Sequence, residues 1–152
     1  MEAFNSIDEI LDFAINSEQE AVDFYTDLAS KMHNPQMKDT FLEFAQEEVQ
    51  HKARLTKIKE DRIFDTGEQE KITDLKIADY TVNVKPSPDM QYADALVLAM
   101  RKEKAAFRLY SALAERTSKP ELKKVFEDLA IEESKHKLRF EIEYDEHVLR
   151  EN

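Results

Sequence analysis

The sequence predicts an all-α protein in which four long helices form an antiparallel bundle. The composition points to helix, because charged residues make up 36% of the 152 residues and Gly occurs once, as is typical of mainly helical chains. The second half also repeats the first at an offset of 85 residues, so that Glu18 and Tyr25 align with Glu103 and Tyr110. At this length we expect a single domain spanning residues 1–152.

A capping residue and a proline predict the first two helices. Ser6 opens an S-x-x-E capping box before an amphipathic run, so the first helix should span about residues 7–33. Asn34 can cap a second helix and Pro35 suits its first position, which places that helix at about residues 35–63. The short turn between the two helices predicts a helical hairpin.

A segment at about residues 65–88 separates this hairpin from the next. It holds the only Gly, two of the four Pro and a β-prone run at residues 80–84, so we expect a long crossover connection with a short extended segment. The third helix is predicted over about residues 89–117 and the fourth over about residues 120–148, again with a Pro at its start. Two repeated hairpins in one domain pack about a pseudo-two-fold axis, which completes the bundle.

Charge and composition exclude several classes of function. The formal net charge of -11 argues against a nucleic-acid partner, because binding phosphates requires a basic face. The chain has no Cys, so disulfides, thiolate catalysis and thiolate-bound metals are excluded. The first residues lack both a basic region and a long apolar run, so we expect a cytoplasmic protein without a membrane span.

Polar residues interrupt the inward apolar stripe of every predicted helix. Three residues advance a helix by about 4.5 Å and nearly one turn, so the two members of a Glu-x-x-His pair can point into one small volume. In each hairpin a further Glu lies as far from the turn as the Glu of this pair does, which places the two carboxylates at one height. The interrupting residues are Glu18, Glu48, His51, Glu103, Glu133 and His136.

Four carboxylates buried together would repel one another and lose their hydration. Two divalent cations would balance the four charges and leave both His neutral and able to bind metal. Carboxylates mixed with imidazole suit iron or manganese, and zinc is an alternative. A single Glu-x-x-His is most often a solvated acid beside a core or surface His, whereas two copies on apolar seams indicate metal ligands. We interpret His33 and His147, which lack such neighbours, as surface residues.

Two tyrosines occupy equivalent positions in the repeat. Tyr25 and Tyr110 lie seven residues after Glu18 and Glu103, which is two turns along the same helix face. Each hydroxyl could therefore lie near a ligand carboxylate. The alternative, which explains the positions equally well, is that the bundle core simply accommodates an aromatic ring there. The acids directly before the ligand Glu of each Glu-x-x-His pair, Glu47 and Glu132, are interpreted as part of a solvated face, with support of the ligands as the alternative.

These residues together resemble the ferritin-like di-iron carboxylate proteins, and rubrerythrins in particular. The resemblance extends over about residues 7–148, and four stretches agree in order and spacing: AINSEQEAVDFY, FAQEEVQHKARL, AMRKEKAAFRLY and LAIEESKHKLRF. It implies a ferritin-like fold and a non-haem site of two iron ions that reacts with peroxide or dioxygen. It also implies that Tyr25 and Tyr110 orient carboxylates or donate a hydrogen bond to bound peroxide.

Two differences from rubrerythrins bear on the activity. Rubrerythrins usually add an iron domain with four Cys, which this Cys-free chain lacks, so electrons would come from a separate donor such as a rubredoxin-like protein. Rubrerythrins also commonly carry an extra Glu where this chain has Ala106, so the ligand set is the symmetric one of bacterioferritin-like centres.

The expected function is therefore an oxidoreductase, a peroxidase or ferroxidase that reduces hydrogen peroxide or dioxygen in oxidative stress. One alternative is a protein that oxidises and binds iron without turnover. Another is a static metal site that only stabilises the bundle. The third helix is apolar on more than one side, which predicts a homodimer, unless residues 65–88 cover that surface.

Overall fold

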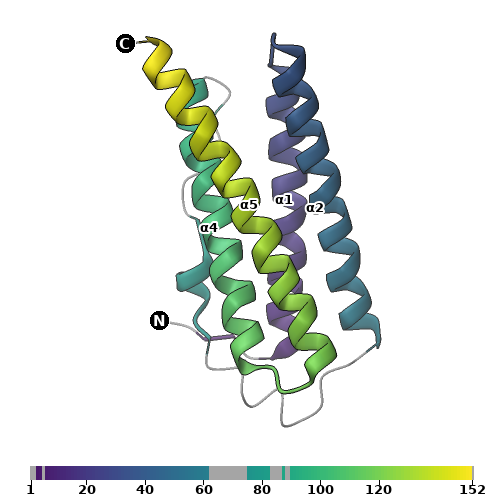
Figure 1. The fold of residues 1–152 in the computed structure, drawn as a ribbon. Coiled ribbons are helices and arrows are strands. Elements are labelled where there is room, and N and C mark those ends of the chain that lie inside the picture. The colour runs from purple at the N-terminus through teal and green to yellow at the C-terminus, as the bar shows by residue number, and fades with distance from the viewer. Residues whose placement is uncertain (1–2, 5, 62–74, 83–86, 88–89, 152) are drawn as a thin grey trace. The chain divides into compact units, whose positions relative to one another are not determined.

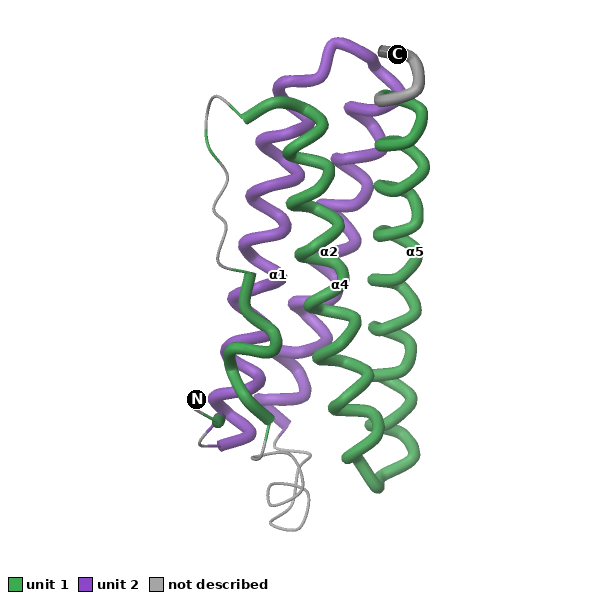
Figure 2. The backbone as a smooth tube through the Cα atoms, turned by 90° about the vertical axis from the view of Figure 1, so that its left-hand side faces the viewer, with its two compact units in different colours: residues 1–3, 74–152 green, residues 4–73 purple. Residues whose placement is uncertain are grey.

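The computed structural model describes residues 3–4, 6–61, 75–82, 87 and 90–151, and most of them are helical (Figure 1). The chain divides into two compact units, one of residues 4–73 and one of residues 1–3 with 74–152 (Figure 2). Each unit contains one helical hairpin.

Helix α1, Ile7–Ser30, begins at the capping residue that the sequence indicates. The Ser6 hydroxyl oxygen accepts a hydrogen bond from the backbone N–H of Glu9 at 3.1 Å, which satisfies a donor that the first turn leaves open. At the other end the N–H of Met32 bonds to the carbonyl of Ala29 at 3.2 Å, a three-residue spacing that tightens the last turn. The helix therefore ends three residues before the expected position, residue 33.

Helix α2, Pro35–Asp61, follows after a short turn and packs against α1. Asn34 caps it, because its side-chain oxygen accepts from the N–H of Gln36 at 2.9 Å. Pro35 at the first helical position removes an N–H that would otherwise have no helical partner. Residues 62–63, the expected end of this helix, lie outside the described residues.

Two lysines of α2 reach across to α1 and fix the register of the hairpin. Lys52 Nζ donates to Gln19 Oε1 at 2.8 Å, and Lys59 pairs with Asp12. Moving seven residues along one helix corresponds to moving seven residues back along the other, as an antiparallel pair requires. These contacts place Glu18 beside the turn of α2 that carries the Glu-x-x-His pair.

The second hairpin consists of α4, Tyr92–Arg116, and α5, Pro120–Glu151. The expected start of α4 at residue 89 lies outside the described residues, and the observed start follows the extended residue Gln91. Helix α5 continues beyond the expected end at residue 148, because no Gly or Pro follows Pro120 within it to stop it.

The turn between α4 and α5 is closed by a buried threonine. Thr117, which is 3% exposed, donates from its hydroxyl to the carbonyl of Leu113 at 2.6 Å. Its N–H bonds to the carbonyl of Ala114 at 3.4 Å. Two of the carbonyls that a helix end leaves open thereby gain donors.

The described part of the long connection contains a short 3-10 helix, η1, Ile77–Tyr80, which packs against α4. Lys76, just before it, forms an isolated antiparallel bridge with Ala3 of the same unit. The β-prone run at residues 80–84 is described only as far as residue 82: Tyr80 ends η1 and Thr81 is extended. The rest of that expected segment lies outside the described residues.

The apolar stripes expected for the four helices form the buried core. Helix spacing also puts Met32, Phe44 and Ala106 in these stripes, but they are only half-buried, and Ala45 is buried next to Phe44. The largest fully buried side chains are Tyr25, Tyr110, Phe41, Phe126, Phe140, Ile10, Leu11, Leu55, Leu96, Leu113 and Leu129.

Candidate metal centre

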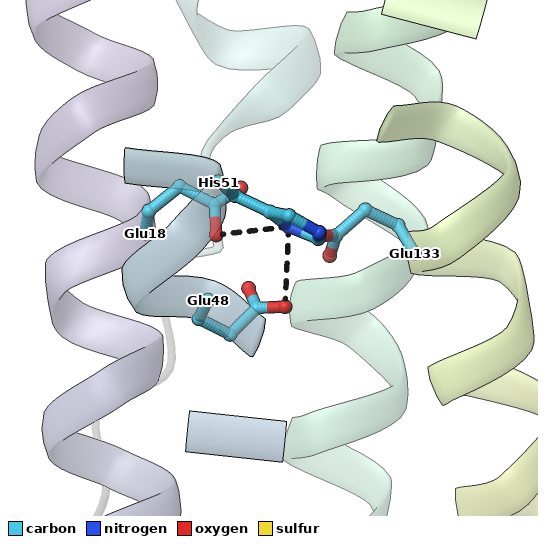
Figure 3. A group of neighbouring side chains, drawn as sticks. All are labelled: Glu18, Glu48, His51 and Glu133. Carbon is cyan, nitrogen blue, oxygen red and sulfur yellow. Dashed lines mark ion pairs between the residues drawn. The ribbon is translucent and has the colours of Figure 1, made fainter. Parts of the chain in front are cut away.

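The first hairpin places two carboxylates and one imidazole together in the core (Figure 3). Nδ1 of His51 lies 3.6 Å from Oε2 of Glu18 and 3.4 Å from Oε1 of Glu48. Each of the three side chains is at most 2% exposed. Each offers one ligand atom, and these atoms lie within 4.8 Å of one another. We call this set the first triad.

Helix geometry explains how the sequence assembles the first triad. Glu48 and His51 are separated by three residues of α2, so their side chains share one face of that helix. Glu18 is brought to the same height by the antiparallel register of α1, which the cross-helix contact of Lys52 holds. The charged head of that lysine bonds to Gln19, the residue next to Glu18, and not to a carboxylate of the triad.

The second hairpin repeats this arrangement with Glu103 on α4 and Glu133 and His136 on α5. Nδ1 of His136 lies 3.7 Å from Oε1 of Glu103, and one ligand atom from each residue lies within 4.8 Å of the others. The exposed fractions are 1%, 1% and 4% in the same order. We call this set the second triad, and the internal repeat of 85 residues relates it to the first.

The donor atoms of each triad fit a transition-metal ion. Ligands about 2.1 Å from a metal lie about 3.4 Å apart in a tetrahedral arrangement and about 3.0 Å apart in an octahedral one. The nitrogen-to-oxygen separations of 3.4 to 3.7 Å are close to these values, and none of these contacts has the geometry of a hydrogen bond. The charge also fits, because two carboxylates and a neutral imidazole carry a charge of -2, which one divalent cation balances.

The two predicted tyrosines are buried on the helices that carry Glu18 and Glu103. Tyr25 on α1 is fully buried, and its ring makes edge contacts with Phe24 and Phe44 at centroid distances of 5.7 and 6.4 Å. Tyr110 on α4 is 1% exposed. Each lies two turns, or about 10.5 Å along the axis, from the Glu of its helix. Their expected contact with a ligand carboxylate stays a prediction.

The remaining predicted positions lie away from the core. Glu47 and Glu132 are half-buried, and His33 is exposed. His147, expected at the surface, instead packs half-buried against the ring of Tyr92 at a centroid distance of 5.0 Å.

Sequence reasoning missed a polar cluster between α4 and α5. The hydroxyl of Tyr92 donates to Oε1 of Glu143 at 3.0 Å. Burial and the negative charge of Glu143 raise the pKa of the Tyr92 phenol well above its ordinary value. The internal repeat gives no sign of this cluster. In the first half, Tyr92 and Glu143 align with Ile7 and Ile58, which are not polar.

Among the described residues, no helix combines the length and apolarity that crossing a membrane requires.

Comparisons with known proteins agree with this fold. The family model described as Rubrerythrin matches residues 9–144. A protein from Thermotoga maritima, described as a ferritin-like diiron-carboxylate protein, has a structure similar to this chain. The TM-score is 0.80, the identity is 23%, and the match covers 97% of this chain and 99% of that one.

A hypothetical protein from Pyrococcus furiosus is also similar, with a TM-score of 0.70 and 25% identity over 90% of this chain and 86% of that one. No curated protein matches the sequence significantly. The structural likeness over nearly the whole chain confirms the predicted fold class, an all-α, ferritin-like fold made of two helical hairpins.

Proposed function

Because the chain belongs to the rubrerythrin family, we propose that it is a non-haem di-iron oxidoreductase that reduces hydrogen peroxide or dioxygen. The observation that carries this proposal is the pair of buried triads, each with two carboxylates and one imidazole within 4.8 Å. Each triad holds one iron ion, so that the chain binds two. Manganese and zinc are the competing metals, because they accept the same oxygen and nitrogen ligands.

Bound iron would supply the redox chemistry, since it accepts and releases electrons one at a time. The carboxylates of each triad hold the metal and balance its charge. The imidazole of His51, and that of His136 in the second triad, binds as the neutral base, which avoids placing a further positive charge in the core.

Because both triads are buried, the reaction would take place away from bulk water. At 1% to 4% exposure, the ligands are shielded from bulk water, which strengthens their electrostatic interaction with a metal. We assign Tyr25 and Tyr110 a supporting role, in which a hydroxyl orients a carboxylate or donates a hydrogen bond to bound peroxide. Their complete burial supports this role, because a buried hydroxyl requires a partner.

The reaction consumes electrons, and the 152 residues contain no Cys that could hold a rubredoxin-type iron. We propose a separate electron-donor protein of the rubredoxin type as the source. A reducing compartment suits such a cycle, so we place the protein in the cytoplasm.

The second candidate function is oxidation and retention of iron without turnover. Ala106 favours it: this half-buried residue lies one turn after Glu103 on α4, where rubrerythrins commonly carry an extra Glu. An alanine supplies no ligand atom, so the ligand set of this chain is the symmetric one of the two triads. The two candidates differ in whether an external donor restores the reduced protein.

The deciding experiment begins with metal-free protein that is loaded with ferrous iron under anaerobic conditions. We expect two iron ions per chain by metal analysis, and fast oxidation when one equivalent of hydrogen peroxide or dioxygen is added. Glu48→Ala and Glu133→Ala should each bind less iron. Glu43→Ala, an exposed acid on α2, is the matched control and should bind as much as the wild type.

Three results separate the alternatives. Wild-type protein that takes up no transition metal, or triad variants that bind as much iron as the wild type, would refute the proposed site. Iron that is bound but oxidised no faster than free iron would indicate a static structural site. Iron that is oxidised fast but not reduced again by a rubredoxin-type donor would indicate the iron-retaining function.

A further inference from the structure

Three basic side chains follow one another along an exposed face of α4. Arg101, Lys104 and Arg108 are three and four residues apart, which places them on one side of the helix, and all three are exposed. We call this set the basic stripe. No described residue forms an ion pair with any of its members. Unpaired positive charge on a chain whose net charge is -11 is a local reversal of sign.

The internal repeat shows that the fold does not require these charges. At an offset of 85 residues, the basic stripe aligns with Asn16, Gln19 and Asp23 of α1, none of which is basic. The amide of Gln19 instead donates to the carboxylate of Asp23 at 3.0 Å. Helices α1 and α4 have the same position in their hairpins and each carries one triad Glu, so the basic stripe indicates a role that α4 alone has.

The basic stripe lies at the height of the second triad and across the helix from it. Glu103 follows Arg101 by two residues, which turns its side chain by about 200° and moves it only about 3 Å along the axis. Glu103 is 1% exposed, whereas Arg101 and Lys104, on either side of it in the sequence, are exposed. One helix, about 10–12 Å across with its side chains, therefore separates this surface from the candidate metal ligand.

Apolar surface accompanies the basic stripe. A groove of about 450 Å³ is lined on α4 by residues from Asp94 to Arg101, with Val97 and Leu98 between them. Toward the other end of the stripe, Phe107 is 39% exposed. Apolar contacts beside a polar, charged rim are the usual composition of a protein interface, and electron-transfer interfaces are among the smallest. The stripe and its borders therefore suit a brief encounter with another protein.

We propose that the basic stripe is the docking surface for the separate electron donor, and that this donor is an acidic protein. The inference rests on the proposed function, which requires electrons from outside the chain. Opposite charge favours an acidic partner, because a local positive surface steers it to one face of a chain that otherwise repels it. The position favours a redox partner, because docking here brings its surface within one helix diameter of the second triad. The donor gives up one electron at each encounter, and the oxidised iron of the proposed site accepts it.

The rate at which a reduced rubredoxin reduces the oxidised, iron-loaded protein tests this inference. An acidic rubredoxin is the probe, mixed by stopped flow without oxygen at about 0.01 M and 0.15 M ionic strength, where the Debye length falls from about 30 to about 8 Å. We expect the second-order rate constant to fall about tenfold or more between the two conditions. At low salt, Arg101→Glu and Arg108→Glu should each lower it about threefold or more, and Asp94→Asn should raise it.

Lys123→Glu is the matched control, because it makes the same change of net charge at an exposed position of α5. It should react with rubredoxin about as fast as the wild type does. Oxidation of the reduced protein by one equivalent of peroxide needs no donor, so its rate should be equal in all variants. Association is measured separately between the oxidised forms of both proteins, which exchange no electron. Docking at the stripe without reduction of the iron would refute the proposed function and leave the docking surface standing.

Three outcomes would overturn the inference. A rate constant that does not change with salt would mean that charge does not guide the donor. Equal rate constants for Arg101→Glu, Arg108→Glu and Lys123→Glu would place the docking surface elsewhere. The third outcome is a protein that does not associate with rubredoxin although a small-molecule reductant sustains its turnover with peroxide. That result would refute the docking surface while the proposed oxidoreductase activity stands.

Discussion

The metal-free protein buries the carboxyl group of Glu48 at a cost in stability. Glu48 is 1% exposed, and it shares a small volume with a second buried carboxylate, Glu18. Glu48→Gln keeps the shape of the side chain and removes the charge. We therefore expect this variant to be more stable than the wild type without metal, by about 1–3 kcal/mol, because burial penalises an unbalanced carboxylate.

Metal should reverse the order of stability. A metal present at 100 times its dissociation constant stabilises the folded protein by about 2.7 kcal/mol, which is about 5–11 °C in Tm at 2–4 °C per kcal/mol for a chain of this size. Glu48→Gln loses a charged ligand, so its metal-dependent shift should be much smaller. Substitution of one residue thus stabilises the metal-free protein and weakens the response to metal.

Thermal and urea unfolding with a chelator, and with ferrous iron under anaerobic conditions, measure both effects. Glu43→Gln removes the same charge from an exposed position of α2 and should change neither quantity by more than about 0.5 kcal/mol. The reasoning is refuted if Glu48→Gln destabilises the metal-free protein, or if its shift with metal equals that of the wild type.

Three further predictions concern the fold. Ser6→Ala removes the cap of α1 and should cost about 1 kcal/mol in urea unfolding, whereas Ser134→Ala, at an internal position of α5, should cost less. Phe126→Ala creates a cavity at a fully buried position and should cost about 3–5 kcal/mol; a smaller loss would show that the core collapses around the site. Tyr92 has a pKa raised by burial and by Glu143, so the unfolded chain loses this proton first as the pH rises above about 10. Wild-type stability should fall there more steeply than that of Tyr92→Phe, and equal slopes would contradict the assignment.

Local sequence signals predicted the helices well where a capping group was present. Ser6 and Asn34 bond to the backbone at the starts of α1 and α2 as their positions suggested, because capping depends on atoms within one turn. The third helix has no such signal: Gln91 makes no side-chain cap, and the expected start was early. The connection before it holds η1, which packs against α4, so its conformation depends on tertiary contacts rather than on β propensity.

Both triads were predictable because the information that defines them is periodic and repeated. Helix spacing places Glu48 and His51 on one face, and the short turn at Asn34 sets the height of Glu18 opposite them. The side-chain distances required the structure. The structure was also needed to decide which residue beside the first triad is buried. Ala45 is buried and Phe44 is only half-buried, because one residue along the chain turns a side chain by about 100° around the helix.

The sequence by itself determined the class of the protein: the hairpins, their repeat, and the six acidic and imidazole residues in apolar stripes. Only the tertiary structure decided which groups away from those stripes meet. The bond between Tyr92 and Glu143 and the groove between Asp94 and Arg101 are two such cases. The physical reason is that helix periodicity specifies the face a residue occupies. Contacts across helices, and open space beside them, depend on how whole side chains of different sizes pack.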